Sequence, residues 1–155
     1  MRSKTKVWLV SLLIPLAVGA LSALFTSGSM ETFASLRQPP LSPPGFIFPI
    51  VWTILFLLMG AGSAIVYLSQ SPVQGAALKV YGLQLVVNFF WSIIFFVLGA
   101  RLFALLWILL LLFLVIRMIL LFYKAVPLAA YLQIPYLLWI LFATYLNAGV
   151  WFLNR

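Results

Sequence analysis

Residues 39–52 read PPLSPPGFIFPIVW, a proline-dense segment that leads directly into a long apolar run. Each proline fixes its own φ angle and disfavours the α region for the residue before it, so the first part should be extended. Ser42 is placed to cap a helical turn that holds Pro43 and Pro44, where a missing N–H costs little. Pro49 follows about one turn later, where a kink is expected. The segment therefore predicts a stiff connector that becomes a buried helix, or more simply a helix start after a loop.

The composition around this segment is that of a membrane protein. Of 155 residues, 66% are hydrophobic and 6% are charged, and the mean hydropathy is +1.26. A soluble domain of this size could not bury so much apolar surface, so we predict an integral membrane protein. The net charge of +8 comes from scattered Lys and Arg residues. It indicates membrane flanks and lipid headgroups as partners and not nucleic acid.

Several kinds of chemistry are excluded by residue types that the chain lacks. It has no cysteine and no histidine, and Glu31 is its one carboxylate. No ordinary metal site and no acid–base pair can be built from such a set, so we predict no metal and no required cofactor. The same absence argues against proton-coupled transport through a carboxylate or histidine relay.

Apolar runs separated by short polar breaks predict five membrane-spanning helices and one long connector. A span of about 20 residues is needed to cross a bilayer, so these runs nearly exhaust the chain in a single transmembrane domain. The predicted helices are residues 7–25, 46–68, 77–98, 102–123 and 128–152, with a lid-like loop at 26–45. The leucine-rich fourth helix has no polar face, so lipid is expected over much of its surface.

The N-terminal run has a second interpretation. A basic segment followed by an apolar run and Val18-Gly19-Ala20 resembles a secretory signal with its cleavage site. We favour a retained helix, because the run continues past Ala20 and Gly19-x-x-x-Ala23 offers a close-packing face. Basic residues are more frequent on the N-terminal side of the predicted bundle, which places the N-terminus in the cytoplasm.

Polar and aromatic residues recur at three- and four-residue intervals in three helices, so each set shares one face. These faces are expected to look inward. They comprise Phe48, Trp52, Phe56, Met59, Ser63 and Tyr67 in the second helix; Tyr81, Gln84, Asn88, Trp91, Ser92 and Phe95 in the third; and Gln133, Tyr136, Ile140, Ala143, Thr144, Asn147 and Trp151 in the fifth.

Two interpretations of these inward faces remain open. Amides and hydroxyls such as Gln84 and Asn88 commonly join membrane helices by hydrogen bonds, and for any single residue this structural role is favoured. As a group, large aromatic rings interleaved with neutral hydrogen-bonding groups suit a flat, largely apolar ligand better than an ion path.

Five segments together resemble the TspO/MBR family, which includes the translocator proteins and the tryptophan-rich sensory proteins. The matching segments are PLAVGALS at 15–22, PPLSPPG at 39–45, FPIVW at 48–52, QLVVNFFWSIIFF at 84–96 and PYLLWILFATYLN at 135–147. Each is weak alone, but they cover nearly the whole chain in the family's order.

The resemblance implies a five-helix bundle with a ligand cavity beneath the long first connector. It implies porphyrin, haem and related tetrapyrroles as ligands, with sterols and benzodiazepine-like compounds as others, and a homodimer. Trp52 and Trp139 match tryptophans of the family's pocket, Asn88 and Trp91 match its third-helix motif, and Ala143 matches a small residue that leaves room for the ligand.

The candidate ligand-binding set combines these positions and the inward faces with Pro43 and Pro44, which match the mouth of the family's second helix. Its members are Pro43, Pro44, Phe48, Trp52, Phe56, Gln84, Asn88, Trp91, Phe95, Trp139, Ala143 and Asn147. Residues 42–45 and the preceding connector are expected to form a lid over them.

Two features depart from the family pattern. The sterol-associated pattern needs a basic residue soon after a tyrosine, and Tyr145 lies too far from Arg155 to satisfy it, so cholesterol binding is not predicted. Trp107 also stands where relatives often carry a carboxylate.

Our leading hypothesis is a membrane receptor or carrier that binds tetrapyrroles by shape and stacking, since haem iron would find no His or Cys ligand. One alternative is a porphyrin-degrading, photo-oxidative enzyme with Trp52 and Trp139 as redox-active side chains. Another is a facilitative transporter of the same ligands.

Overall fold

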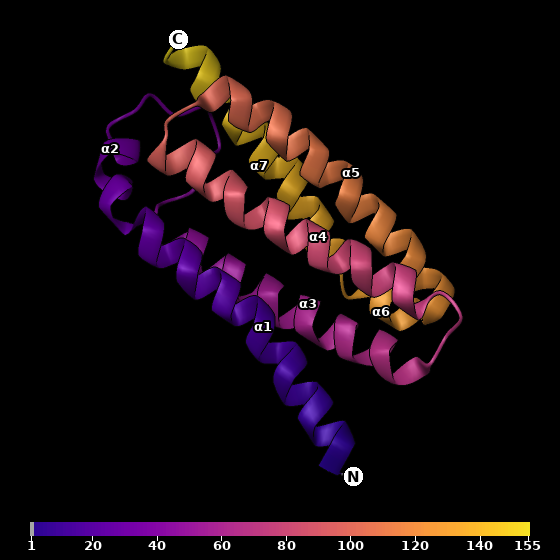
Figure 1. The fold of residues 1–155 in the computed structure, drawn as a ribbon. Coiled ribbons are helices and arrows are strands. Elements are labelled where there is room, and N and C mark those ends of the chain that lie inside the picture. Colours follow the sequence, from indigo (N-terminus) through magenta and orange to yellow (C-terminus); the bar gives the residue numbers. More distant parts are fainter. Residues whose placement is uncertain (1) are drawn as a thin grey trace.

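The computed structural model describes residues 2–155, which form a bundle of long helices (Figure 1). Five segments have the length and apolar composition to cross a membrane: Ser3–Ala34, Ile47–Ser69, Gln74–Val97, Arg101–Ala125 and Pro127–Leu153. No strand occurs within residues 2–155. The prediction of an all-α membrane protein with five spans is confirmed.

The helices alternate in direction, and the two ends of the described chain lie at opposite ends of the bundle (Figure 1). The long helices are α1 (Arg2–Thr26), α3 (Ile47–Ser69), α4 (Gln74–Ser92), α5 (Arg101–Ala125) and α7 (Ile134–Leu153). Shorter helical segments are the 3-10 turn η1 (Ser27–Ser29), α2 (Met30–Ala34), the π-helical turn η2 (Ile93–Val97) and α6 (Pro127–Tyr131).

The predicted cap of α3 is wrong. α3 begins at Ile47, and Phe46 occupies its N-cap position. The Ser42 hydroxyl instead donates a hydrogen bond to the Pro39 carbonyl at 2.7 Å. Leu41 adopts a left-handed φ of 71°, which turns the chain back so that this short bond can form.

Pro49 lies in the first turn of α3, one residue after Phe48. The first N–H groups of a helix have no partner inside the helix, so a proline there removes no hydrogen bond. The expected kink at Pro49 is therefore not required. The N–H groups of Ile47 and Phe48 donate to the carbonyls of Pro44 and Gly45.

The fifth span, predicted as one helix, is divided into α6 and α7. Gln133 lies at the division and is completely buried. Its Nε2 donates to the Leu58 carbonyl of α3 at 3.0 Å. Gly62 makes room for this side chain, because a Cβ at Gly62 would clash with Nε2 of Gln133. The interruption thus places an amide against the α3 backbone.

α1 packs against α3 on one side and is otherwise the most outward-facing long helix. Only 6% of the most apolar part of the segment Ser3–Ala34 is buried, against 39% of the most apolar part of α5. A Cβ added at Gly60 of α3 would lie 2.6 Å from the Ser11 carbonyl oxygen, so the two backbones cross closely there. A Cβ at Gly19 would lie 2.8 Å from the Phe56 ring, so the Gly19 face is used for packing within the bundle.

α5 has a broad outward apolar surface, as predicted, and also carries a buried stripe on its other side. Its neighbours are α4, α6 and α7. The buried stripe on α5 consists of Ala104, Ile108, Leu111, Leu114, Val115, Met118, Leu121 and Phe122. Leucines on all sides conceal this stripe in the sequence, because hydrophobic periodicity needs a polar face for contrast.

Candidate functional site

Aromatic rings from α2, α3, α4, η2 and α7 form a continuous cluster near the end of the bundle where α3 begins. Trp52 is its centre: its ring centroid lies 5.5 Å from Phe56, 6.2 Å from Tyr136 and 6.4 Å from Trp139. Phe48 extends the contacts, with its centroid 5.8 Å from that of Trp139. We call the set Phe33, Phe48, Trp52, Phe56, Trp91, Phe95, Phe96, Tyr136 and Trp139 the aromatic cluster.

The connector contributes one ring to this cluster. Phe33, on the short helix α2, lies 5.6 Å from Phe95 and 5.0 Å from Phe96 between ring centroids. It also meets Phe48 at 6.5 Å. Phe33 was not among the predicted site residues, although the apolar Met30 and Phe33 interrupt a mostly polar stretch. A short amphipathic turn within the connector was the available signal.

The polar groups beneath the rings form a hydrogen-bonded chain across α4 and α7. Nδ2 of Asn88 donates to the Tyr136 hydroxyl at 2.7 Å, and that hydroxyl donates to Oε1 of Gln84 at 2.6 Å. Nε2 of Gln84 approaches the Met59 sulfur of α3 at 3.8 Å. All four side chains are buried. The chain therefore ties three helices together without any charged group.

A second pair of polar contacts lies closer to the α2 end. The Trp91 Nε1 donates to Oδ1 of Asn147 at 3.0 Å, and Nδ2 of Asn147 donates to the Arg101 carbonyl at 2.9 Å. Three of the predicted ligand-binding amides, those of Gln84, Asn88 and Asn147, thus have protein partners in this conformation. A ligand that uses them must share or displace these bonds.

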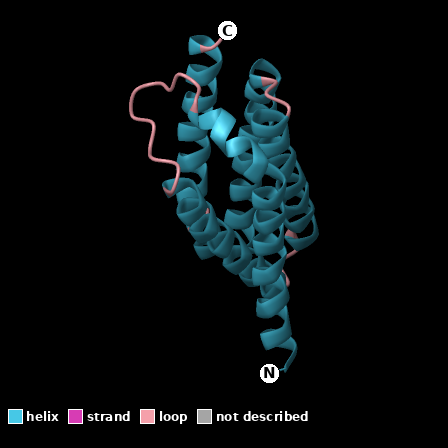
Figure 2. Ribbon diagram, turned by 90° about the vertical axis from the view of Figure 1, so that its left-hand side faces the viewer, coloured by secondary structure: helices cyan, strands magenta, loops and turns pink. Residues whose placement is uncertain are grey.

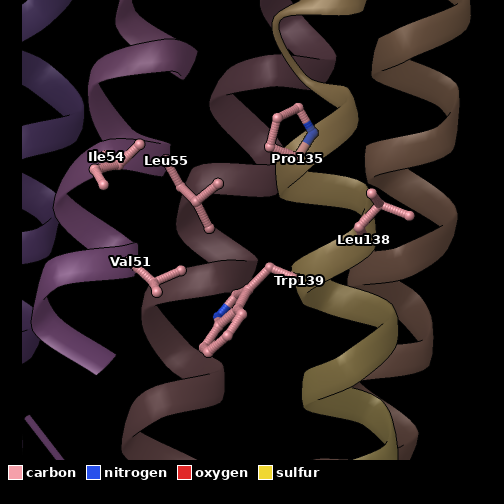
Figure 3. Close-up of a pocket in the computed structure, with 6 residues that line it drawn as sticks. All are labelled: Val51, Ile54, Leu55, Pro135, Leu138 and Trp139. Carbon is pink, nitrogen blue, oxygen red and sulfur yellow. The ribbon is translucent and has the colours of Figure 1, made fainter. Parts of the chain in front are cut away.

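An apolar groove of about 380 Å³ lies between α3 and α7 (Figure 3). Its lining consists of Val51, Ile54, Leu55, Pro135, Leu138 and Trp139. Val51 and Leu55 extend from α3 toward α7, and the Trp139 indole extends from α7 toward α3. Of the predicted ligand-binding residues, Trp139 alone belongs to both the groove and the aromatic cluster.

Trp139 differs from two other tryptophans in how its ring nitrogen is used. Nε1 of Trp91 is bonded to Asn147, and Nε1 of Trp107 donates to the Val87 carbonyl at 2.8 Å. Nε1 of Trp139 is buried and has no hydrogen-bond partner among the described residues. Burying an unpaired donor costs about 1–3 kcal/mol, so an acceptor that reached this nitrogen would be favoured.

The connector between α2 and α3 is fastened to the outer part of α7. The Tyr145 hydroxyl donates to the Pro40 carbonyl at 2.6 Å. Asn154 bonds both backbone groups of Arg37: its Oδ1 accepts from the N–H at 3.0 Å and its Nδ2 donates to the carbonyl at 2.9 Å. Pro39 is buried against Gly149, where a Cβ would meet its ring at 2.6 Å. Figure 2 shows this connector running beside the upper helices as a long loop.

The remaining predicted site residues are divided between the interior and the rim. Ala143 and Phe95 are each only 5% exposed. Pro43 is half-buried and Pro44 is exposed, both in the turn that leads into α3. Among the residues predicted to look inward, Tyr67 is 50% exposed and points away from the core.

Comparison with known proteins adds a separate line of support. The profile of the TspO/MBR family matches residues 11–152. The chain is 36% identical over 145 residues to the tryptophan-rich protein TspO of Archaeoglobus fulgidus, covering 93% of this chain and 94% of the relative. It is 33% identical to the translocator protein of Bos taurus, over 90% of this chain and 85% of the relative. The tryptophan-rich sensory protein of Cereibacter sphaeroides is 31% identical, with 88% of each chain covered.

Proposed function

The chain belongs to the TspO/MBR family of membrane proteins, and from that premise we propose that it is a receptor or carrier for tetrapyrroles and related apolar ligands. The observation that carries the proposal is the aromatic cluster centred on Trp52. Flat ring systems are recognised by stacking and edge contacts with such side chains, in sites with few polar groups. The ligand would lie among these rings, which come mainly from α3, α4, η2 and α7.

The electrostatics of the cluster suit a macrocycle held by its faces. The hydrogen-bonding groups that border it, Asn88, Gln84 and the Tyr136 hydroxyl, are neutral. They can offer donors and acceptors to a ring nitrogen or a carbonyl without the cost of burying a charge. The chain has no histidine or cysteine to bind a haem iron, so recognition would depend on the ring and not on the metal.

A titration with matched tryptophan variants tests this proposal. Protein in detergent would be titrated with metal-free protoporphyrin, and binding would be followed by the absorption band of the porphyrin. Trp52→Leu removes the central ring, and we expect affinity to fall about fivefold, because an aromatic contact of this kind contributes about 1 kcal/mol. Trp107→Leu is the control, since that indole is bonded to the α4 backbone outside the cluster.

Equal affinities for the two variants would refute the placement of the ligand. Circular dichroism of each variant would establish that the helices remain. Wild-type protein that fails to bind any tetrapyrrole would refute the proposed function itself.

We also propose that the N-terminus faces the cytoplasm. Five spans place the two termini on opposite sides of the membrane. The basic residues that flank the spans on the N-terminal side are Arg2, Lys4, Lys6, Lys79 and Lys124, and those on the other side are Arg37, Arg101 and Arg155. Basic residues favour the cytoplasmic side. Alkaline phosphatase fused after Arg155 should be active if this orientation holds. An inactive phosphatase fusion, together with a fluorescent fusion of green fluorescent protein at the same position, would show the opposite orientation.

A further inference from the structure

The groove between α3 and α7 opens toward the membrane. Ile54 and Leu138, on its two sides, are 52% and 60% exposed. They continue the outward apolar surface of the bundle, which in a membrane protein is covered by lipid. Close backbone packing on α3 comes from α1, α4 and α6, and much less from α7. The two helices that border the groove are thus held apart over part of their length.

The position and chemistry of the groove indicate what fills it. Trp139 lies near the middle of the apolar span Pro127–Leu153, so a bilayer crossed by this span would surround it with hydrocarbon. All six lining side chains are apolar except for the indole nitrogen of Trp139. Its volume of about 380 Å³ lies within the range of roughly 300–1,000 Å³ typical of ligand pockets. A lipid acyl chain is the occupant with the matching chemistry at that depth.

The inner end of the groove reaches the aromatic cluster through one side chain. The Trp139 indole lines the groove (Figure 3). It also contacts the rings of Phe48 and Trp52. No hydrogen bond from its Nε1 holds the indole in place, in contrast to Trp91. A rotation of this ring would therefore break packing contacts but no polar bond of the ring nitrogen.

We propose that the α3–α7 groove is a lateral opening that holds a lipid acyl chain at rest. We further propose that apolar ligands enter the aromatic cluster from the bilayer through it, with the Trp139 indole as the movable barrier. The second part rests on the proposed function, whereas the acyl-chain site does not. Entry from the bilayer is consistent with the connector being fastened over the α7 end by Tyr145 and Asn154, which restricts entry from water.

The native chain lacks cysteine, so a single introduced thiol can be labelled selectively. Ile54→Cys, modified with a phenyl maleimide in detergent, places a bulky group at the groove. Phe113→Cys, modified in the same way, is the control, because Phe113 is 63% exposed on α5, outside the groove lining. Leu138→Cys supplies a second groove variant if circular dichroism shows that the first has lost helix.

The acyl-chain site is tested without any tetrapyrrole. Protein would be reconstituted into phosphatidylcholine vesicles whose acyl chains carry bromine near their midpoints, which quench nearby tryptophan fluorescence. The contribution of Trp139 is the difference between each protein and its Trp139→Phe form. We expect this contribution to be quenched in the unlabelled protein and in labelled Phe113→Cys, and protected in labelled Ile54→Cys. Quenching that is absent, or unchanged by the groove label, would overturn the acyl-chain site.

The entrance is tested by the kinetics of protoporphyrin binding in ordinary vesicles. A label at the entrance should slow both association and dissociation about tenfold and leave Kd nearly unchanged, because a barrier affects both directions equally. Unchanged rates would overturn the entrance. A weakened Kd with unchanged association would also overturn it, since the groove would then belong to the binding site. If unlabelled protein binds no tetrapyrrole, the proposed function fails and the entrance with it, whereas the quenching result still decides the acyl-chain site.

Discussion

Replacing Tyr136 by Phe removes one oxygen atom from the centre of the bundle. Tyr136 is fully buried, and its hydroxyl accepts from Asn88 and donates to Gln84. The ring of Phe retains the edge contact with Trp52. The substitution therefore tests the hydrogen-bonded chain and leaves the aromatic cluster filled.

The expected loss of stability follows from two broken bonds. Hydrogen bonds between membrane helices contribute about 0.6 kcal/mol on average and up to about 1.7 kcal/mol. Two such bonds give about 1–3 kcal/mol, and the amides of Asn88 and Gln84 also lose a buried partner. We expect Tyr136→Phe to lower the free energy of unfolding by about 2 kcal/mol.

The measurement is reversible unfolding in mixed micelles of dodecyl maltoside and dodecyl sulfate, followed by far-ultraviolet circular dichroism. Tyr123→Phe is the matched control, because Tyr123 is 51% exposed, and we expect a change below about 0.5 kcal/mol. A double-mutant cycle with Asn88→Leu should show coupling of about 1 kcal/mol, since the two side chains share one bond.

A loss for Tyr136→Phe no larger than that of the control would refute the reasoning. It would mean that the amides of Asn88 and Gln84 pair equally well without the hydroxyl. Additive effects in the double-mutant cycle would refute the Asn88–Tyr136 bond in particular.

Four further predictions follow from the same structure. Gly60→Val should destabilise the bundle by about 1–3 kcal/mol in the same micelles, because the α1 backbone lies against this position, while Gly75→Val, which meets nothing within 4 Å, should cost less. Asn154→Ala should accelerate hydrogen exchange in residues 35–46 and leave exchange in α4 unchanged, since it frees the connector alone. Ala143→Phe should weaken protoporphyrin binding in an absorption titration while the helical dichroism stays the same, because the buried site has room only for a small side chain. Haem and metal-free protoporphyrin should bind with affinities within about threefold of each other, since no histidine or cysteine is present to bind iron.

Periodicity predicted the inward face of α4 well. Tyr81, Gln84, Asn88 and Trp91 recur at helical spacing, and all are buried. A repeat of 3.6 residues identifies a face, but it does not identify the partner across the interface. The pairing of Asn88 with Tyr136 depends on how far two helices slide along each other, which a single sequence does not encode locally.

Other features depended on tertiary contacts that outweigh local preference. The break between α6 and α7 is stabilised by Gln133 bonding to the Leu58 carbonyl on another helix. Ser42 has a good capping side chain, but α3 begins only at Ile47, beyond its reach. Its hydroxyl instead donates to the Pro39 carbonyl beside the left-handed turn at Leu41. The groove between α3 and α7 arises from the spacing of two helices, so its lining could not be foreseen beyond Trp139.

The fastening of the connector to α7 has a consequence for the order of assembly during synthesis. Tyr145 and Pro40 are 105 residues apart, and Asn154 and Arg37 are 117 apart. Chains emerge from the ribosome with the N-terminal end first. The bonds from Tyr145 and Asn154 to the connector can therefore form only after α7 has been synthesised. Docking of the connector thus follows the synthesis of α7, and replacing Asn154 by Ala would leave every helix in place yet remove this fastening.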